Sequence, residues 1–226
     1  MNRYITELIG TFFLVLIIGL TGNPIAIGFG LAALVYMGGH ISGAHYNPAV
    51  SLALFLRKRL SSKDLVIYWV FQIIGAILAA LAFVAITTES FAPAPAPNVS
   101  TFIAILVEFL FTFALILVIL NVATTKKNAG NSYYGMAIGI TILGAAFAGG
   151  PFSGGAYNPA VGIGPILVDT FRGGTSISNL LIYLVGPFLA GLTAPFVFRI
   201  MCPDEFADID LQYHEDNGEN EENDNN

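Results

Sequence analysis

The chain has 226 residues, of which 55% are hydrophobic and 11% are charged, and its mean hydropathy is +0.73. Because a soluble domain keeps about a quarter of its residues charged, this composition excludes a single soluble domain and indicates an integral membrane protein. The formal net charge of −6 belongs to the C-terminal end, since ten of the fifteen acidic residues lie between Asp204 and Asp224. The single cysteine, Cys202, excludes an intrachain disulfide and a cysteine-based metal cluster.

Six apolar runs are predicted to be membrane-spanning helices. Several of them reach the roughly 20 residues that a helix needs to cross about 30 Å of hydrocarbon. The second and fifth runs are shorter, and the neighbouring glycines indicate that their ends lie inside the protein rather than in lipid. In chain order the runs are Tyr4–Leu20, Ile25–Met37, Leu65–Ile86, Phe102–Leu120, Tyr133–Ala148 and Ile177–Ile200.

Two further apolar segments, Asn47–Leu56 and Asn158–Val168, are only about half as long as a membrane span. Each follows a glycine-rich stretch, Gly38–Gly43 or Gly149–Gly155, in which we expect extended backbone that enters the membrane before a short helix begins. Non-helical backbone at that depth is tolerated only where it is buried in protein or lines a watery cavity. These segments therefore predict a pore.

The distribution of basic residues predicts the orientation in the membrane. Eight of the nine lie where the predicted spans place them on one face, and only Arg172 falls on the other. The positive-inside bias then places both termini in the cytoplasm and residues 89–98 outside, where Ala92–Pro97 is expected to be extended and polyproline-like. The eight are Arg3, Arg57, Lys58, Arg59, Lys63, Lys126, Lys127 and Arg199.

The expected domains are a membrane channel domain over residues 1–203 and an acidic cytoplasmic tail over residues 204–226. The tail has few apolar residues, so we expect it to be disordered in solution, with a regulatory or partner-binding role as the alternative. The protein is expected in the cytoplasmic or plasma membrane, in contact with the lipid bilayer.

An internal repeat divides the channel domain at about residues 1–90 and 99–203. Shifting the sequence by 111 positions aligns Ile41–Val50 with Phe152–Val161, with seven of ten residues identical. Each half holds three of the predicted spans, and an odd number inverts the second half relative to the first. Inverted repeats place their shared site near the bilayer midplane.

The repeated motifs Asn47-Pro48-Ala49 and Asn158-Pro159-Ala160 read as two helix starts. Asn is a favoured N-cap, Pro belongs at the first helical position and Ala is a strong helix former. Inversion then brings two helix N-termini together, each with unpaired N–H groups and about half a positive elementary charge. We expect a pore midplane that repels cations and offers donors, including both Asn amides, to a neutral solute.

With these motifs the chain resembles the major intrinsic protein family, the aquaporins and aquaglyceroporins, over about residues 4–200. The lead-in Gly39–His45 and the sequence Val185–Phe188 also carry the resemblance. It implies an all-α fold with six transmembrane helices and two re-entrant half-helices, assembled as a homotetramer with one pore per protomer. It further implies a ladder of backbone carbonyls along the pore, from Gly43, Ala44, His45, Tyr46, Gly154, Gly155, Ala156 and Tyr157.

The resemblance also suggests roles for ionisable side chains within the spans. Glu7 and Glu108 match residues that accept hydrogen bonds from the re-entrant loops, so we expect them to be buried and structural. His40 is expected to be a buried loop-packing group, and His45 has the better claim to a place near the pore. Tyr46 and Tyr157 are expected to pack behind the ladder, with pore-facing hydroxyls as the alternative.

The sequence departs from the family pattern at the outer constriction. Most members follow the second Asn-Pro-Ala with Arg, where this chain has Val161. The matching positions give a filter of Ile27, Ala146, Gly155 and Val161, which is apolar and has no side-chain donor. Strict water selectivity is therefore not expected. A specialised glycerol channel is not supported either, because Gly162 stands where such channels carry Asp.

The predicted function is passive conduction of water or other small neutral solutes, such as glycerol and other polyols, urea, ammonia and neutral metalloid hydroxides. An ordinary water-selective aquaporin is the alternative within the family. An ion-coupled secondary transporter is the alternative of another class, because such transporters also use inverted repeats and broken helices. A junction protein without flux remains a further option. No enzyme activity, cofactor, metal or nucleic-acid partner is expected.

Overall fold

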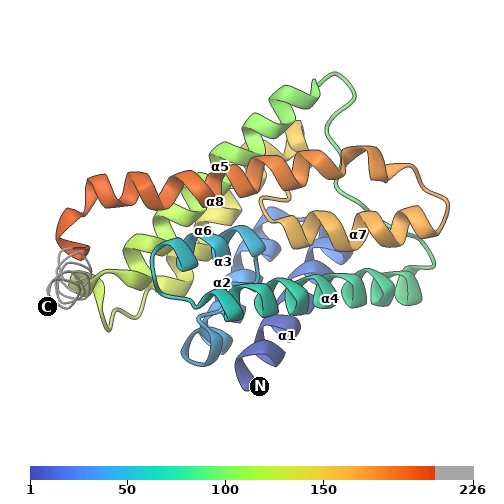
Figure 1. Cartoon of the computed structure of the whole chain (residues 1–226). Helices are drawn as coiled ribbons and strands as arrows, with labels where there is room; N and C mark the ends of the chain where they lie inside the picture. Colours follow the sequence, from blue (N-terminus) through green and yellow to red (C-terminus); the bar gives the residue numbers. More distant parts are fainter. Residues whose placement is uncertain (207–226) are drawn as a thin grey trace, which may run out of the picture.

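The computed structural model describes residues 1–206, and every regular element in this part of the chain is helical. Figure 1 shows long helices surrounding two short ones, α3 and α7, which lie in line beneath α8. The helices are α1 (Asn2–Thr21), α2 (Pro24–Ser42), α3 (Pro48–Leu56), α4 (Ser62–Thr87), α5 (Thr101–Thr124), α6 (Tyr134–Ser153), α7 (Pro159–Phe171) and α8 (Leu180–Met201), with short 3₁₀ turns at Lys126–Asn128, Ser176–Asn179 and Pro203–Glu205.

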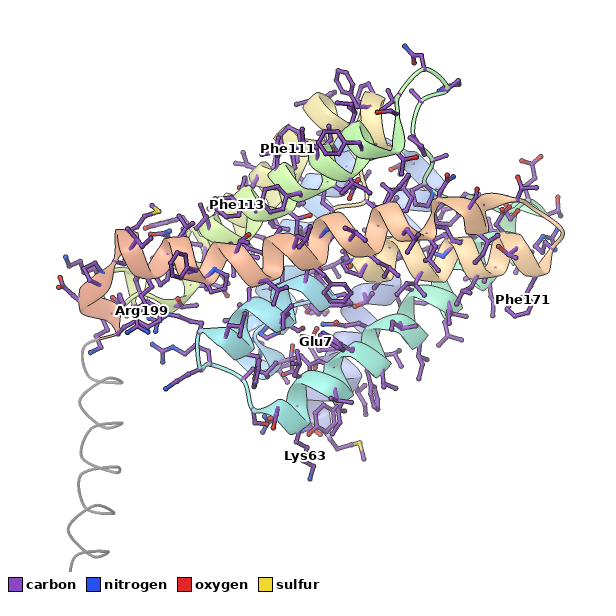
Figure 2. All side chains as sticks on the ribbon, turned by 45° about the horizontal axis from the view of Figure 1, so that its top comes forward. Glu7, Lys63, Phe111, Phe113, Phe171 and Arg199 are labelled. Atoms are coloured by element: carbon purple, nitrogen blue, oxygen red, sulfur yellow. The ribbon has the colours of Figure 1, made fainter. Side chains whose placement is uncertain are left out.

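Six of these helices are long and apolar enough to cross a membrane, which confirms the predicted all-α membrane fold. Their outward faces carry large exposed apolar side chains, including Phe29, Leu81, Phe102 and Phe196. An apolar surface of this extent is unsuited to water and matches a lipid or protein environment. Figure 2 shows the contrast with Glu7, which lies inside the bundle.

The two ends of the bundle differ in composition. The N-terminus, Arg57–Arg59 and Lys126–Lys127 lie at one end, which we call the basic end. The segment Ala92–Pro97 lies at the other, the proline-rich end, where Ala96 N donates to Phe152 O at 3.1 Å.

The glycine-rich stretches were expected to be extended, and the structure corrects this. Helix α2 continues to Ser42 and α6 to Ser153, so only Gly43–Asn47 and Gly154–Asn158 are non-helical. Each helix ends in a left-handed glycine, a common C-cap, with φ of 86° at Gly43 and 89° at Gly154.

The glycines inside these helices make room for a neighbouring aromatic ring. A Cβ on Gly38 would lie 1.8 Å from Tyr46 Oη, and a Cβ on Gly149 would lie 2.3 Å from Tyr157 Oη. The glycines therefore mark tertiary contacts within helices rather than helix ends, which explains why both predicted spans were too short.

The described chain continues past residue 203 as a packed segment at the basic end. The Arg57 side chain is fully buried; its guanidinium donates to Glu205 O at 3.2 Å and to Glu205 Oε2 at 3.0 Å. The guanidinium also lies 4.4 Å from the ring centroid of Phe206, which is only 7% exposed. Glu205 and Phe206, assigned to the tail from sequence, thus pack against the bundle. The rest of the predicted disordered tail, 207–226, lies outside the described residues.

Candidate pore

The N-termini of α3 and α7 meet inside the bundle. Asn47 caps α3 by accepting from Ala49 N at 2.9 Å, and Asn158 caps α7 by accepting from Ala160 N at the same distance. Both asparagines have extended backbones and both precede a proline at the first helical position. The capping oxygen of each amide faces its own helix, which leaves the amide nitrogen free to point elsewhere.

The two amide nitrogens cross between the repeats. Asn47 Nδ2 donates to Tyr157 O at 2.9 Å, and Asn158 Nδ2 donates to Tyr46 O at 2.8 Å. Each amide is thus held at both ends, by its own helix and by the backbone of the other repeat. Because an amide nitrogen carries two hydrogens, one donor on each asparagine remains for another acceptor.

The backbone that leads to each asparagine is strained. Ala44 and Tyr46 in the first repeat, and Tyr157 in the second, have φ between 48° and 50°, in the left-handed region that non-glycine residues rarely adopt. Such conformations persist only where surrounding contacts hold them, and they cluster at functional sites. The contacts that hold this backbone come from two buried carboxylates.

In the first repeat, Glu7 holds the loop before α3. Its Oε1 accepts from Ser42 Oγ at 2.6 Å and from His45 N at 3.0 Å, and its Oε2 accepts from Tyr46 N at 2.7 Å and from Gln72 Nε2 at 2.8 Å. The side chain is fully buried. Four donors replace the water that an ionised carboxylate requires, so the group can be buried without a cation.

In the second repeat, Glu108 holds the loop before α7 in the same way. Its Oε1 accepts from Ser153 Oγ at 2.7 Å and from Ala156 N at 3.0 Å, and its Oε2 accepts from Tyr157 N at 2.5 Å. The last residue of each helix that leads into these loops is also held by a tyrosine, since Tyr68 Oη donates to Ser42 O and Tyr183 Oη donates to Ser153 O.

The tyrosines that precede the asparagines turn away from the loops and pack against helices. Tyr46 Oη donates to Leu34 O at 3.0 Å, and Tyr157 Oη donates to Ala145 O at 2.9 Å. Both tyrosines are at most 1% exposed. Their hydroxyls are therefore engaged with helix backbone.

A narrow cavity of about 50 Å³ surrounds the asparagine pair. Since one water needs about 10–15 Å³ of such space, it holds a short file of waters or one small solute. All four residues of the predicted filter line it: Ile27, Ala146, Gly155 and Val161. Further lining residues are Ala44, His45, Tyr46, Asn47, Ala156, Tyr157 and Asn158, together with the apolar side chains Leu14, Ile18, Leu31, Val35, Val50, Leu115, Ile119, Ile138 and Ile142.

Some predicted site residues lie behind this lining. Gly154 does not line the narrow cavity, and a Cβ added to it would lie 2.6 Å from Ala94 O. The motif residues Pro48, Ala49, Pro159 and Ala160 are buried behind the asparagines.

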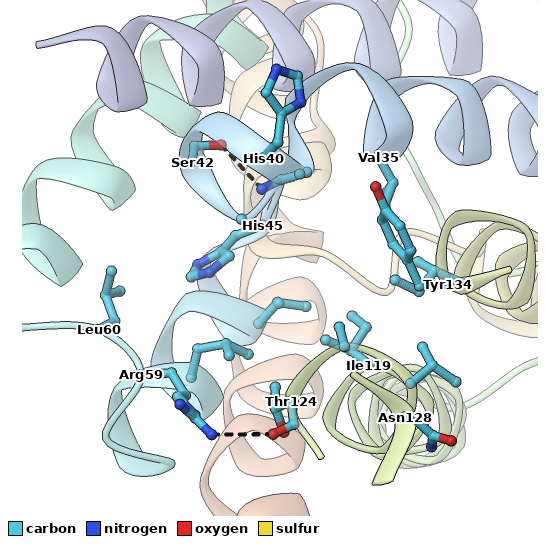
Figure 3. A pocket seen from close by; sticks show the side chains of 18 of the residues that line it. Val35, His40, Ser42, His45, Arg59, Leu60, Ile119, Thr124, Asn128 and Tyr134 are labelled. Carbon is cyan, nitrogen blue, oxygen red and sulfur yellow. Dashed lines mark hydrogen bonds between the residues drawn. The ribbon is translucent and has the colours of Figure 1, made fainter. Parts of the chain in front are cut away.

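At the basic end the lumen widens into a vestibule of about 750 Å³ (Figure 3). Across it, Arg59 donates to Thr124 O at 3.3 Å. His40 was expected to be buried, and this is wrong: it is exposed and lines the vestibule. The reason is that α2 continues to Ser42, which places His40 on its last turn. His45 lines both the vestibule and the narrow cavity.

Sequence reasoning missed several side chains that hold the loops. Ser42 and Ser153 are identical across the repeat, so the alignment carried a signal for them. Gln72 carried none, because its fully buried amide reaches Glu7 from α4, 65 positions away in the sequence.

Six apolar spans around two half-helices that meet at a narrow lumen define a membrane channel fold. The model of the family named "Major intrinsic protein" matches residues 16–198, and the chain belongs to this family. This result, together with the six candidate spans, makes it a multi-pass integral membrane protein.

Among curated relatives, the chain is 37% identical over 217 residues to "Glycerol uptake facilitator protein-like 6" of Lactiplantibacillus plantarum, covering 89% of this chain and 98% of the relative. It is 32% identical over 239 residues to "Aquaporin AqpM" of Methanothermobacter thermautotrophicus, covering 88% and 97%. The X-ray structure of the aquaglyceroporin from Plasmodium falciparum superposes with a TM-score of 0.78 at 22% identity, covering 90% of this chain and 98% of that one. This last likeness supports the fold.

Proposed function

We propose that this protein is a passive channel for water and other small neutral solutes. The observation that carries the proposal is the meeting of two helix N-termini, each with an asparagine amide, inside a narrow apolar cavity. The names of the relatives, a glycerol uptake facilitator-like protein and an aquaporin, point to the same class of solute.

The geometry explains how a neutral solute passes. A solute that enters the narrow cavity loses part of its water shell, and apolar walls offer no replacement. The second hydrogens of Asn47 and Asn158 donate to a solute oxygen, while the carbonyls of the two loops accept from its hydroxyl or N–H groups. Because the amides are held in place, little reorganisation accompanies each passage.

The same geometry opposes cations. The N-terminus of each half-helix carries about half a positive elementary charge, and both point at the midplane. An ion that enters loses hydration that apolar walls do not restore. Since Val161 stands where most family members carry Arg, exclusion of ions rests mainly on the two helix termini.

The constriction favours a broad range of neutral solutes over water alone. Ile27, Ala146, Gly155 and Val161 line one cavity and supply no side-chain donor. Polyols, urea, ammonia and neutral metalloid hydroxides are therefore candidate solutes. The buried carboxylates argue against the ion-coupled alternative, because loop donors already occupy Glu7 and Glu108.

The assembly and orientation are proposed on the same grounds. The exposed apolar helix faces suit contact with lipid and with three further copies in a homotetramer. The concentration of Arg and Lys at the basic end supports a cytoplasmic location for that end and for both termini.

The decisive experiment is stopped-flow light scattering of proteoliposomes that contain the purified protein. Water, glycerol, urea and a neutral metalloid acid are compared with empty liposomes, with and without a proton gradient. We expect flux that is independent of the gradient and reduced in Asn47→Ala and Asn158→Ala at equal insertion. Flux that requires the gradient, or is absent for every solute, contradicts the proposal.

A further inference from the structure

The vestibule at the basic end is lined by positive charge without a balancing acid. Arg3, Arg59 and Lys126 are among its lining residues, and no Asp or Glu is. Arg3 has an acidic partner 3.0 Å away, whereas no carboxylate in the described part of the chain pairs with the exposed Arg59. A hollow that is lined by charge of one sign, with walls of low dielectric constant, concentrates groups of the opposite sign. The vestibule therefore favours an anionic occupant.

The chain itself carries a run of acidic residues directly beyond its described part. Residues 207–226, which we call the acidic segment, hold eight Asp and Glu and no Lys or Arg. The eight are Asp208, Asp210, Glu215, Asp216, Glu219, Glu221, Glu222 and Asp224. The charge of this segment is thus opposite to that of the vestibule lining.

The residues before the acidic segment fix its starting point beside the vestibule. Glu205 Oε1 accepts from the backbone nitrogen of Lys126 at 2.7 Å, and Lys126 is one of the lining residues. Phe206 packs over the buried guanidinium of Arg57, 4.4 Å from its ring centroid. Twenty residues span up to roughly 65 Å when extended, so the vestibule lies within reach of the acidic segment.

We propose that the vestibule is a binding site for the acidic segment of the same chain, which reduces solute flux while it is bound. Val35, Ala44 and His45 line both the vestibule and the narrow cavity, so an occupant of the vestibule stands in the path of the solute. Carboxylates of the segment pair with the cations of the lining, above all with Arg59. The inference rests on the proposed channel function and adds a means of control to it.

The expected size of the effect follows from the tether. A short flexible connection gives an effective concentration of about 1–10 mM. Against a dissociation constant of about 1 mM, typical of a weak contact, the segment is bound about half to nine-tenths of the time. Complete release should then raise flux by about two- to tenfold.

The first experiment measures glycerol flux in zwitterionic phosphatidylcholine liposomes, where no anionic lipid competes for the basic end. The full-length protein is compared, at equal insertion, with a protein that ends at Phe206 and with a full-length variant whose eight acids in the acidic segment are Asn or Gln. We expect both variants to show the two- to tenfold rise. Raising KCl on both sides from about 0.01 M to about 1 M, which shortens the Debye length from about 30 Å to about 3 Å, should raise flux only in the full-length protein.

The second experiment locates the site in the vestibule. Arg59→Gln should recover at least half of the rise in the full-length protein and change nothing in the protein that ends at Phe206. Lys63→Gln is the matched control, because Lys63 is an exposed cation of the basic end that does not line the vestibule, and it should leave flux unchanged in both. A synthetic peptide of residues 207–226, added at millimolar concentration on both sides, should lower the flux of the shortened protein, whereas a peptide with Asn and Gln in place of the acids should not.

The outcomes separate this inference from the proposed function. A lack of flux in both the full-length and the shortened protein refutes the channel function itself. Equal flux in these two proteins refutes only the role of the acidic segment. A rise on shortening without a rise on neutralisation would mean that bulk rather than charge reduces flux. An equal rise from Arg59→Gln in the shortened protein would mean that Arg59 acts on the solute directly, and either result overturns the proposal.

Discussion

Replacement of Glu108 by Gln tests whether the buried carboxylate holds the second loop. Gln keeps the shape of the side chain but has one oxygen and one NH₂ group. The carboxylate accepts from Ala156 N through Oε1 and from Tyr157 N through Oε2. Whichever way the amide is oriented, its NH₂ therefore faces a backbone N–H, and one buried donor loses its acceptor.

The size of the effect follows from these contacts. A buried N–H without a partner costs about 1–3 kcal/mol, and each remaining bond weakens by about 1 kcal/mol when its acceptor loses its charge. Because a neutral amide is easier to bury than a carboxylate, part of this loss is recovered. We expect Glu108→Gln to lower the free energy of unfolding by about 3 kcal/mol.

The assay is an SDS titration in mixed detergent micelles, followed by fluorescence of Trp69, the single tryptophan. This probe reports on the half-helix α3, because Trp69 Nε1 donates to Pro48 O at 2.9 Å. Glu89→Gln makes the same chemical change at an exposed side chain and should change stability by less than about 0.5 kcal/mol. A loss below about 1 kcal/mol in Glu108→Gln, or one equal to the control, would refute the reasoning.

Three further changes are expected to have measurable effects. Gly38→Ala should lower stability by about 1–3 kcal/mol, since its Cβ would lie 1.8 Å from Tyr46 Oη, and adding Tyr46→Phe should recover part of the loss in the SDS titration. Glu205→Gln should cost about 3 kcal/mol in the same titration, because it removes the partner charge of the fully buried Arg57. Val161→Arg should reduce glycerol flux more than water flux in stopped-flow measurements, because a long side chain enters the narrow cavity.

Each of these expectations has a clear contrary result. Strictly additive losses for Gly38→Ala and Tyr46→Phe would mean that the hydroxyl does not fill the space beside the glycine. An unchanged midpoint for Glu205→Gln would show that the segment at 203–206 adds nothing to the bundle. Equal reductions of water and glycerol flux in Val161→Arg would show that Val161 does not line the constriction.

Much of the fold could be predicted from the sequence because its signals are local. The six spans follow from runs of apolar residues, whose length alone decides whether a helix crosses the hydrocarbon. The starts of α3 and α7 follow from an asparagine cap and a proline at the first helical position. The repeat then supplied the pairing of Asn47 with Asn158, because an odd number of spans inverts one half.

Tertiary contacts decide where α2 and α6 end, and therefore where His40 lies. No local sequence pattern indicates these contacts. Glycine favours a helix end when only its backbone freedom is considered, yet Gly38 and Gly149 lie inside helices because each faces a tyrosine ring eight residues ahead. The sequence alone does not show that packing against a tyrosine ring outweighs the preference of glycine for helix ends at these positions.

The finer arrangement of the pore was decided by the tertiary structure. Three pairs of polar side chains lie within hydrogen-bond distance although they are separated in the chain: Gln72 and Glu7 by 65 positions, Ser51 and His45 by 6, and Glu205 and Arg57 by 148. A buried polar group must find a partner wherever the fold brings one, and that partner is fixed by how helices pack rather than by neighbouring residues. Composition, span length and helix capping thus determined the class of protein, whereas the partners of its buried polar groups became visible only once the helices were assembled.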